Sequence, residues 1–158
     1  MEALTTQQNS QSSETTRQYI TINIGSEQYG INIKYVDNIV RMQKITRVPK
    51  AQDYFVGVIN LRGEILPVMS LRKKFELEDD IYTNNTRIII VKLEQQGMVG
   101  LIVDSVKEVV NLDDSDIEKA NLSLAEGGQA YISAVGKIGN GLISLLNLQA
   151  VIIEKETV

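Results

Sequence analysis

The chain of 158 residues contains no cysteine, no histidine and no tryptophan. Without cysteine it has no disulfide framework and no thiol nucleophile, which fits a reducing compartment. Without histidine it lacks the usual general base near neutral pH and a principal zinc ligand. Any catalysis would have to rest on carboxylates or lysines, so the composition argues against an enzyme.

Positive charge is also in the minority. Lys and Arg number 16 against 20 Asp and Glu, which gives a formal net charge of -4 and argues against nucleic acid as the main partner. No apolar run reaches the roughly 18 residues of a membrane-spanning helix, and the amino terminus lacks the basic and then apolar pattern of a signal peptide. We therefore expect a cytoplasmic protein with no direct membrane insertion.

Motifs for metals and cofactors are missing too. Asp113, Asp114 and Asp116 fit the start of a calcium loop, but the central glycine and the closing glutamate do not follow in register. We interpret the segment as a solvated acidic turn, followed by a helical turn around Asp116–Ala120. The sequence predicts no cofactor and no metal. An enzyme that uses carboxylates stays an alternative, and it requires a buried Asp or Glu with a shifted pKa in a cleft.

Valine and isoleucine dominate the apolar residues, and both favour strands. After a polar segment, 1–16, which we predict to be a disordered tail, apolar residues alternate over 18–33 in the pattern of a hairpin. An extended segment follows at 34–40. Residues 54–71 then form two apolar strands around a tight turn at Arg62 and Gly63, where the glycine supplies a positive φ.

The chain repeats itself. The 54–71 pattern returns at 131–148, an offset of 77 given by 131 minus 54, while Gly30 matches Gly100 at an offset of 70, given by 100 minus 30. Ser70 and Asn147 are possible helix N-caps after each hairpin, and the acidic segment 76–86 joins the halves. We predict a mainly all-β protein of two five-stranded barrels packed side by side, approximately 17–82 and 83–155, with short helices that include one at the C-terminus.

The repeat does not reproduce the arginine of the hairpin turn. The second copy has Gly139 and Asn140 where the first has Arg62 and Gly63. Hairpin ends are exposed, so an arginine there is ordinarily a solvated turn residue. Its absence from the second copy separates it from the scaffold and favours a function at a surface. Two packed barrels also leave a groove in which an amphipathic helix can dock.

Several segments, in this order, resemble the CheW family of bacterial chemotaxis coupling proteins. They are Gln28–Ile31, Val36–Ile39, Ile45–Pro49, Gly57–Gly63, Ile65–Val68 and Leu71–Arg72. The resemblance covers about residues 17–155. It implies two SH3-like barrels, no enzymatic activity, and a scaffold that links the cytoplasmic tips of chemoreceptors to the regulatory domain of the histidine kinase CheA.

Carried over by position, the resemblance implies a protein-binding surface. Its residues are Val36, Asn38, Ile39, Val56, Gly57 and Arg62. Many family members have glutamate at position 38, able to pair with the hairpin arginine, whereas this chain has Asn38. We expect Arg62 to hydrogen-bond Asn38 or a neighbour such as Glu64.

Three alternatives to a free-standing coupling protein remain. The same fold occurs in the regulatory domain of CheA and in the receptor-coupling half of CheV, although the length of the chain leaves room for neither a kinase core nor a receiver domain. A pair of small barrels that binds nucleic acid is the third alternative, which the net negative charge disfavours.

Overall fold

The computed structural model describes residues 16–119 and 131–152. Of the predicted tail 1–16, residues 1–15 lie outside this part. Thr16, which we assigned to the tail, is instead the first residue of a strand. Strands dominate, so the all-β prediction is confirmed.

The strands and helices follow the order expected from the alternation of apolar residues. The strands are β1 (Thr16–Ile24), β2 (Glu27–Asn32), β3 (Val36–Arg41), β4 (Phe55–Leu61), β5 (Glu64–Ser70), β6 (Arg87–Leu93), β7 (Gly97–Val103), β8 (Ser105–Asp113), β9 (Ile117–Lys119), β10 (Ile132–Ile138) and β11 (Gly141–Leu146). Two α-helices, α2 (Leu71–Lys74) and α3 (Leu148–Ile152), and two 3-10 turns, η1 (Ile33–Tyr35) and η2 (Asp114–Asp116), complete them.

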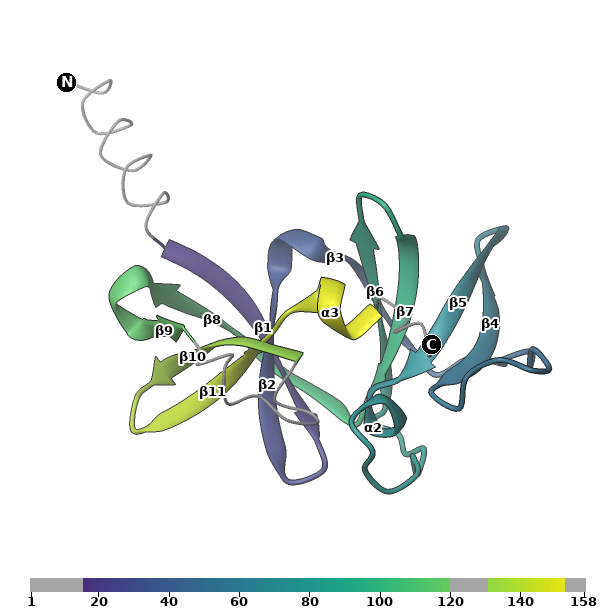
Figure 1. Cartoon of the computed structure of the whole chain (residues 1–158), viewed down its shortest axis with the longest axis horizontal. Helices are drawn as coiled ribbons and strands as arrows, with labels where there is room; N and C mark the ends of the chain where they lie inside the picture. Colours follow the sequence, from purple (N-terminus) through teal and green to yellow (C-terminus); the bar gives the residue numbers. More distant parts are fainter. Residues whose placement is uncertain (1–15, 120–130, 153–158) are drawn as a thin grey trace, which may run out of the picture.

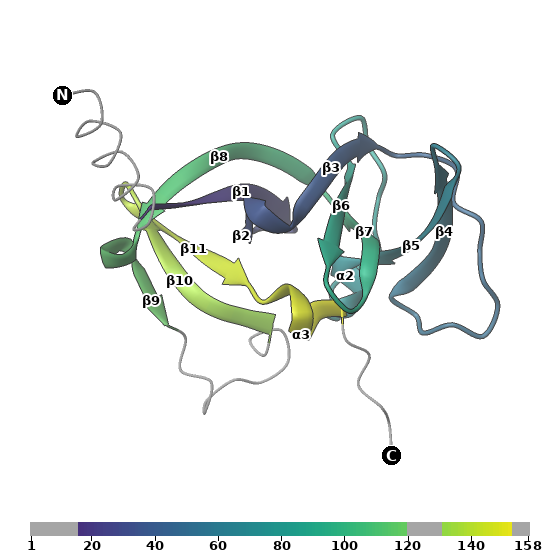
Figure 2. The same cartoon turned by 90° about the horizontal axis from the view of Figure 1, so that it is seen from above.

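The strands form two sheets, each rolled into a barrel, and these lie side by side in Figures 1 and 2. One sheet has the order β8-β1-β2-β11-β10-β9 and the other the order β3-β6-β7-β5-β4. The first has six strands because the short β9 adds to its edge beside β10.

The barrel boundaries predicted at 17–82 and 83–155 are wrong. Strands β1 and β2, from the first half of the chain, lie between β8 and β11 of the second half, and β6 and β7 lie between β3 and β5 of the first. The chain crosses from one sheet to the other through η1 and again at Asp104. Each barrel therefore takes its first hairpin from the opposite half. The alternation of apolar residues identifies a strand but carries no information about its distant partner.

The predicted duplication is confirmed by equivalent contacts. Gly30 on β2 pairs with Leu145 on β11 in parallel, and Gly100 on β7 pairs with Val68 on β5 in the same way. Gly30 and Gly100 differ by 70 residues, and Val68 and Leu145 by 77, which are the two offsets of the repeat.

A second pair of equivalent contacts closes each half. The Ser70 N–H donates to the Tyr54 carbonyl over 2.7 Å, and the Asn147 N–H donates to the Tyr131 carbonyl over the same distance. Ser70 and Asn147 are also the helix N-caps predicted from the sequence, since their side chains accept hydrogen bonds from the N–H groups of Lys73 and Ala150.

The helical turn predicted around Asp116–Ala120 is wrong for the residues that the structure describes. A 3-10 turn ends at Asp116, and Ile117 begins β9, which runs to Lys119 and is stabilised by pairing with β10. Ala120 lies outside the described residues.

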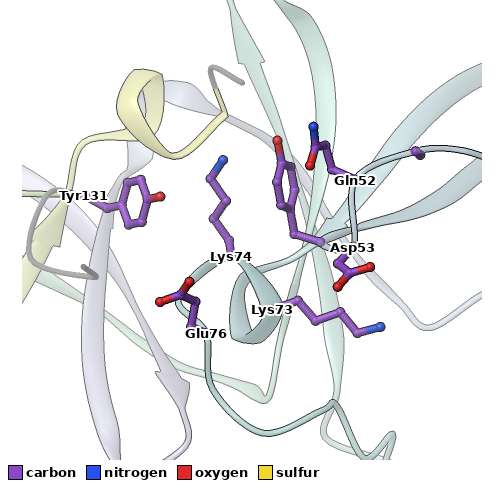
Figure 3. A pocket seen from close by; sticks show the side chains of 8 residues that line it. Gln52, Asp53, Lys73, Lys74, Glu76 and Tyr131 are labelled. Carbon is purple, nitrogen blue, oxygen red and sulfur yellow. The ribbon is translucent and has the colours of Figure 1, made fainter. Parts of the chain in front are cut away.

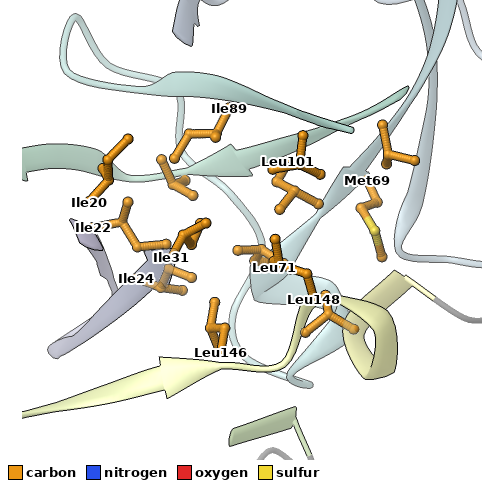
Figure 4. Close-up of a cluster of buried hydrophobic side chains, with 14 of the residues drawn as sticks. Ile20, Ile22, Ile24, Ile31, Met69, Leu71, Ile89, Leu101, Leu146 and Leu148 are labelled. Atoms are coloured by element: carbon orange, nitrogen blue, oxygen red, sulfur yellow. The ribbon is translucent and has the colours of Figure 1, made fainter. Parts of the chain in front are cut away.

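The main hydrophobic core lies between the two sheets (Figure 4). It combines Ile22 and Ile24 of β1 with Val91 of β6 and Leu101 of β7. The opposite face of β6, with Ile88 and the other apolar residues inside its barrel, forms a smaller core. Because the middle of β6 is buried on both faces, its residues 88–91 are continuously apolar rather than alternating.

Candidate functional site

The β4–β5 hairpin ends in a two-residue turn, Arg62 and Gly63, as predicted. Both residues have positive φ, +54° and +88°, as in the turns that match the twist of a hairpin. The side chain of Asn60 reinforces the turn, because its Oδ1 accepts a hydrogen bond from the Gly63 N–H over 2.9 Å. The Arg62 side chain is exposed at the tip.

The second hairpin shows what this turn requires of its residues. Gly139, which is equivalent to Arg62, has a φ of +53°. Arg62 therefore adopts the left-handed conformation for which the other copy uses glycine. A side chain with a Cβ atom costs about 1–2 kcal/mol in that conformation. Stability of the turn alone does not explain the arginine.

The hydrogen bond expected between Arg62 and Asn38 or Glu64 is not formed. The Asn38 Oδ1 accepts instead from the N–H of its own neighbour, Ile39, over 2.8 Å. Within residues 16–119 and 131–152, the Arg62 guanidinium has no hydrogen-bond or ion-pair partner. Its five donors are available to a group from outside the chain.

The predicted residues on β3 differ in their exposure. Val36 packs against the main core, and Ile39 is 36% exposed. A β-bulge between Val36 and Asn38 leaves Asp37 as the extra residue opposite β6. Asn38 is half-buried. Of the three candidates on this strand, Ile39 presents the most accessible apolar surface.

The two predicted residues on β4 are adjacent but differ in kind. Val56 is half-buried and lines a cavity of about 320 Å³. The other residues that line it are Met42, Gln43, Ile45, Arg47 and Tyr82. Gly57 is buried, and a Cβ atom there would lie 2.2 Å from the Thr46 carbonyl oxygen. Gly57 thus permits the close approach of the segment that pairs Thr46 with Val58.

Sequence reasoning missed a pair of exposed side chains at the hairpin ends. Ile65, which follows the first turn, is 64% exposed, and its equivalent Leu142 is 67% exposed. Alternation along each strand was the available signal, since Leu66 and Ile143 are buried and their neighbours must face outward. Both hairpins of the duplicated fold therefore present one apolar side chain to solvent beside the turn.

A larger cavity, of about 570 Å³, surrounds the end of α2 (Figure 3). Lys74, only 8% exposed, extends from α2 into this cavity in the figure. Its Nζ lies 3.9 Å from the ring centre of Tyr54 and 5.7 Å from that of Tyr131, so the rings stabilise its charge. Asp53 and Glu76 line the same cavity together with lysines, which gives it both signs of charge.

Asp80 meets one condition of the carboxylate-enzyme alternative. Burial raises the pKa of its carboxyl. However, one of its oxygens accepts a hydrogen bond from the Ser70 hydroxyl, which caps α2, and Asp80 lines neither cavity described above. Among the described residues, no three Asp or Glu side chains gather in a way that could hold a metal ion. Asp80 fastens the segment between α2 and β6 to the barrel.

Membrane insertion through a helix has no candidate in residues 16–119 and 131–152, because no helix there is long and apolar enough to cross a bilayer.

The fold and the candidate site define a protein-interaction module. It combines two packed SH3-like barrels with an arginine on a strained turn and with exposed apolar residues at both hairpin ends.

Comparison with known proteins gives the family. Residues 18–156 match the model of the CheW-like domain. The chain is 35% identical to the chemotaxis protein CheW of Bacillus subtilis, with 91% of each chain covered, and 30% identical to that of Klebsiella aerogenes, with 89% and 84% covered. This protein belongs to the CheW-like domain family, and its function is that of a chemotaxis scaffold.

Structural comparison agrees. The crystal structure of the scaffolding protein TtCheW from Thermoanaerobacter tengcongensis matches with a TM-score of 0.79 and 30% identity, covering 87% of this chain and 88% of that one. The CheV3 protein of Helicobacter pylori is 27% identical, but the chain spans 40% of its length. The alternatives of a nucleic-acid-binding barrel pair and of a CheV-type or CheA-type module are therefore not favoured.

Proposed function

We propose that this protein is a non-catalytic adaptor of the cytoplasm that couples the tips of chemoreceptors to the regulatory domain of the kinase CheA. Membership of the CheW-like family supports the proposal. The observation that carries it is the conformation of Arg62. The arginine has a φ of +54° where the duplicated hairpin has glycine, and its guanidinium projects from the tip of the turn into solvent.

The receptor-binding surface in this proposal combines Arg62 with the exposed or half-buried candidates on β3 and β4. Ile39 and Val56 supply apolar contacts, and Arg62 supplies a charge that can bind carboxylates on a helical receptor tip. Gly57 contributes indirectly, by allowing β4 to close against Thr46. Val36 and Asn38 hold β3 in place beside β6.

The kinase-binding surfaces in this proposal are the ends of the two barrels. Ile65 and Leu142 support this assignment, because they occupy equivalent positions beside the two hairpin turns and are largely exposed. A partner with the same double-barrel fold offers apolar ends of matching shape, so that barrels of the two proteins pack end to end. Signals then pass by changes in the assembly, with no chemistry on this chain.

The test is Arg62→Ala, assayed separately with a purified receptor-tip fragment and with the purified CheA regulatory domain. We expect the affinity for the receptor tip to fall about tenfold or more, as for an arginine at the centre of an interface. Binding to the CheA domain and thermal stability should remain, because substitutions at exposed turns usually change stability by less than about 0.5 kcal/mol.

Lys137→Ala is the matched control, since it removes an exposed cation from the equivalent hairpin. It should leave receptor binding unchanged. Normal receptor-dependent activation of CheA by the Arg62→Ala variant would overturn the proposal.

A further inference from the structure

We infer that Asn60 is a positioning residue, which holds Arg62 in the conformation that its partner binds. The inference rests on the proposed function of Arg62 and goes beyond it, because Asn60 acts through the turn and not through contact with the partner. The backbone pairs Asn60 with Ile65 across the hairpin, one step before the last pair of the ladder. Asn60 is therefore at the base of the loop that presents the arginine.

The contact that carries the inference is the hydrogen bond from the Gly63 N–H to Asn60 Oδ1, over 2.9 Å. It closes a ring that contains Arg62. Any rotation of the Arg62 backbone out of the left-handed region would move the Gly63 N–H away from the Asn60 oxygen. The side chain of Asn60 thus opposes the escape of Arg62 to the extended conformations that an arginine prefers.

The duplicated hairpin shows that this bond is not needed to close the turn itself. Lys137 stands where the first hairpin has Asn60, and its side chain has no acceptor. The second turn forms with Gly139 at a φ of +53°. Glycine reaches that conformation without help. The side-chain bond accompanies the arginine, so its role is to keep the arginine in place.

Holding the turn in advance reduces the ordering that binding must complete. A loop fixed in its bound conformation binds more tightly with no added contact, because less conformational entropy is lost on association. Asn60 should therefore strengthen receptor binding through Arg62 alone. It should have no effect once the arginine is absent.

The experiment compares Asn60→Ala and Asn60→Asp in the full chain. Asn60→Ala should weaken binding to the receptor-tip fragment about fivefold, with CheA-domain binding and melting temperature retained. Asn60→Asp keeps an oxygen that can accept from Gly63 and should bind within about twofold of the parent. In the Arg62→Ala background, adding Asn60→Ala should cause no further loss.

A measurement on the free protein tests the turn without any partner. The Gly63 amide proton should exchange with solvent several-fold faster in Asn60→Ala than in the parent or in Asn60→Asp. Unchanged exchange, unchanged receptor affinity of Asn60→Ala, or an equal loss in the Arg62→Ala background would each overturn the inference. If Arg62→Ala itself binds the receptor tip normally, the proposed function fails and the inference fails with it. If only the Asn60 variants behave as the parent, the inference alone fails.

Discussion

Gly57 and Arg62 lie on one hairpin, but only the first has the residue type that its local structure requires. Gly57 is buried, and its missing Cβ makes room for a carbonyl of a neighbouring segment, whereas Arg62 has a side chain in a conformation that suits glycine. Gly57 is explained by packing, because only glycine fits beside that carbonyl. Arg62 is not explained by packing or by backbone preference, and residues in strained conformations of this kind are often found at binding sites.

Gly57→Ala should lower the free energy of unfolding by about 2–3 kcal/mol. The new Cβ would lie 2.2 Å from the Thr46 carbonyl oxygen, and that oxygen belongs to backbone that cannot rotate away. Urea unfolding followed by circular dichroism measures the change. Gly141→Ala is the control, since its Cβ would meet only the Ile138 carbonyl at 3.7 Å. Equal stability of the two variants would contradict a packing role for Gly57.

The sequence singled out Arg62 because the chain contains its own comparison, a second hairpin without the arginine. It did not predict what Asn38 does. A short amide side chain can bond to its own backbone, to a neighbour or to solvent, and these choices differ little in free energy. Here Asn38 bonds to the Ile39 N–H, which leaves the Arg62 side chain exposed.

At the scale of elements, the start of α2 is fastened by a partly exposed ion pair. Arg72 binds Asp104 with both ends of its guanidinium, Nε to Oδ1 over 2.8 Å and Nη2 to Oδ2 over 2.6 Å. Asp104 also accepts from the Gly25 N–H, in the β1–β2 turn. One carboxylate thus joins a helix, the crossing between the sheets and a hairpin from the opposite half of the chain.

Asp104→Asn should destabilise the protein by about 1–2 kcal/mol at pH 7, a value reduced because the pair is partly exposed to solvent. The hydrogen bond from Arg72 lowers the pKa of Asp104 below its ordinary value. A lowered pKa contributes stability above the unfolded pKa, and that contribution disappears as the pH falls through the folded pKa. The difference between variant and parent should therefore shrink below about pH 4 in urea unfolding.

Asp80→Asn is the matched control and should show the opposite pH dependence. Burial raises the pKa of Asp80, so the folded state favours the protonated carboxyl. The stability that this carboxyl contributes is present below its unfolded pKa and is lost as the pH rises through the folded pKa. The variant should gain stability relative to the parent between acid and neutral pH. Parallel pH profiles for the two variants would contradict both assignments.

The whole molecule is a duplication in which the two halves exchange their first hairpins. The strands were predictable because alternation and turn residues are local, as at Gly25 and Gly63. The duplication was predictable from the offsets. The exchange was not, because β1 has the same apolar face whether it packs over its own half or over the other. Pairing of distant strands is decided by the assembled core.

The exchange predicts that neither half folds alone. In a fragment of residues 1–84, the face of β1 with Ile20 and Ile22 would lose the apolar face of β6 and β7, and β3 would lose its neighbour β6. Fragments 1–84 and 85–158 should each give the circular dichroism and narrow amide NMR dispersion of an unfolded chain. Mixed at equal concentration, they should recover the strand signal and a dispersed spectrum.

The control is the full chain cut between Asn84 and Asn85, two exposed residues, at an inserted protease site. It should keep its fold, because both halves are already in place. A monomeric, folded fragment of residues 1–84 would show that the first half forms a barrel with its own hairpin. Light scattering distinguishes that monomer from a dimer in which the first hairpin of each fragment packs against the other copy. The exchanged arrangement of the strands permits such a dimer.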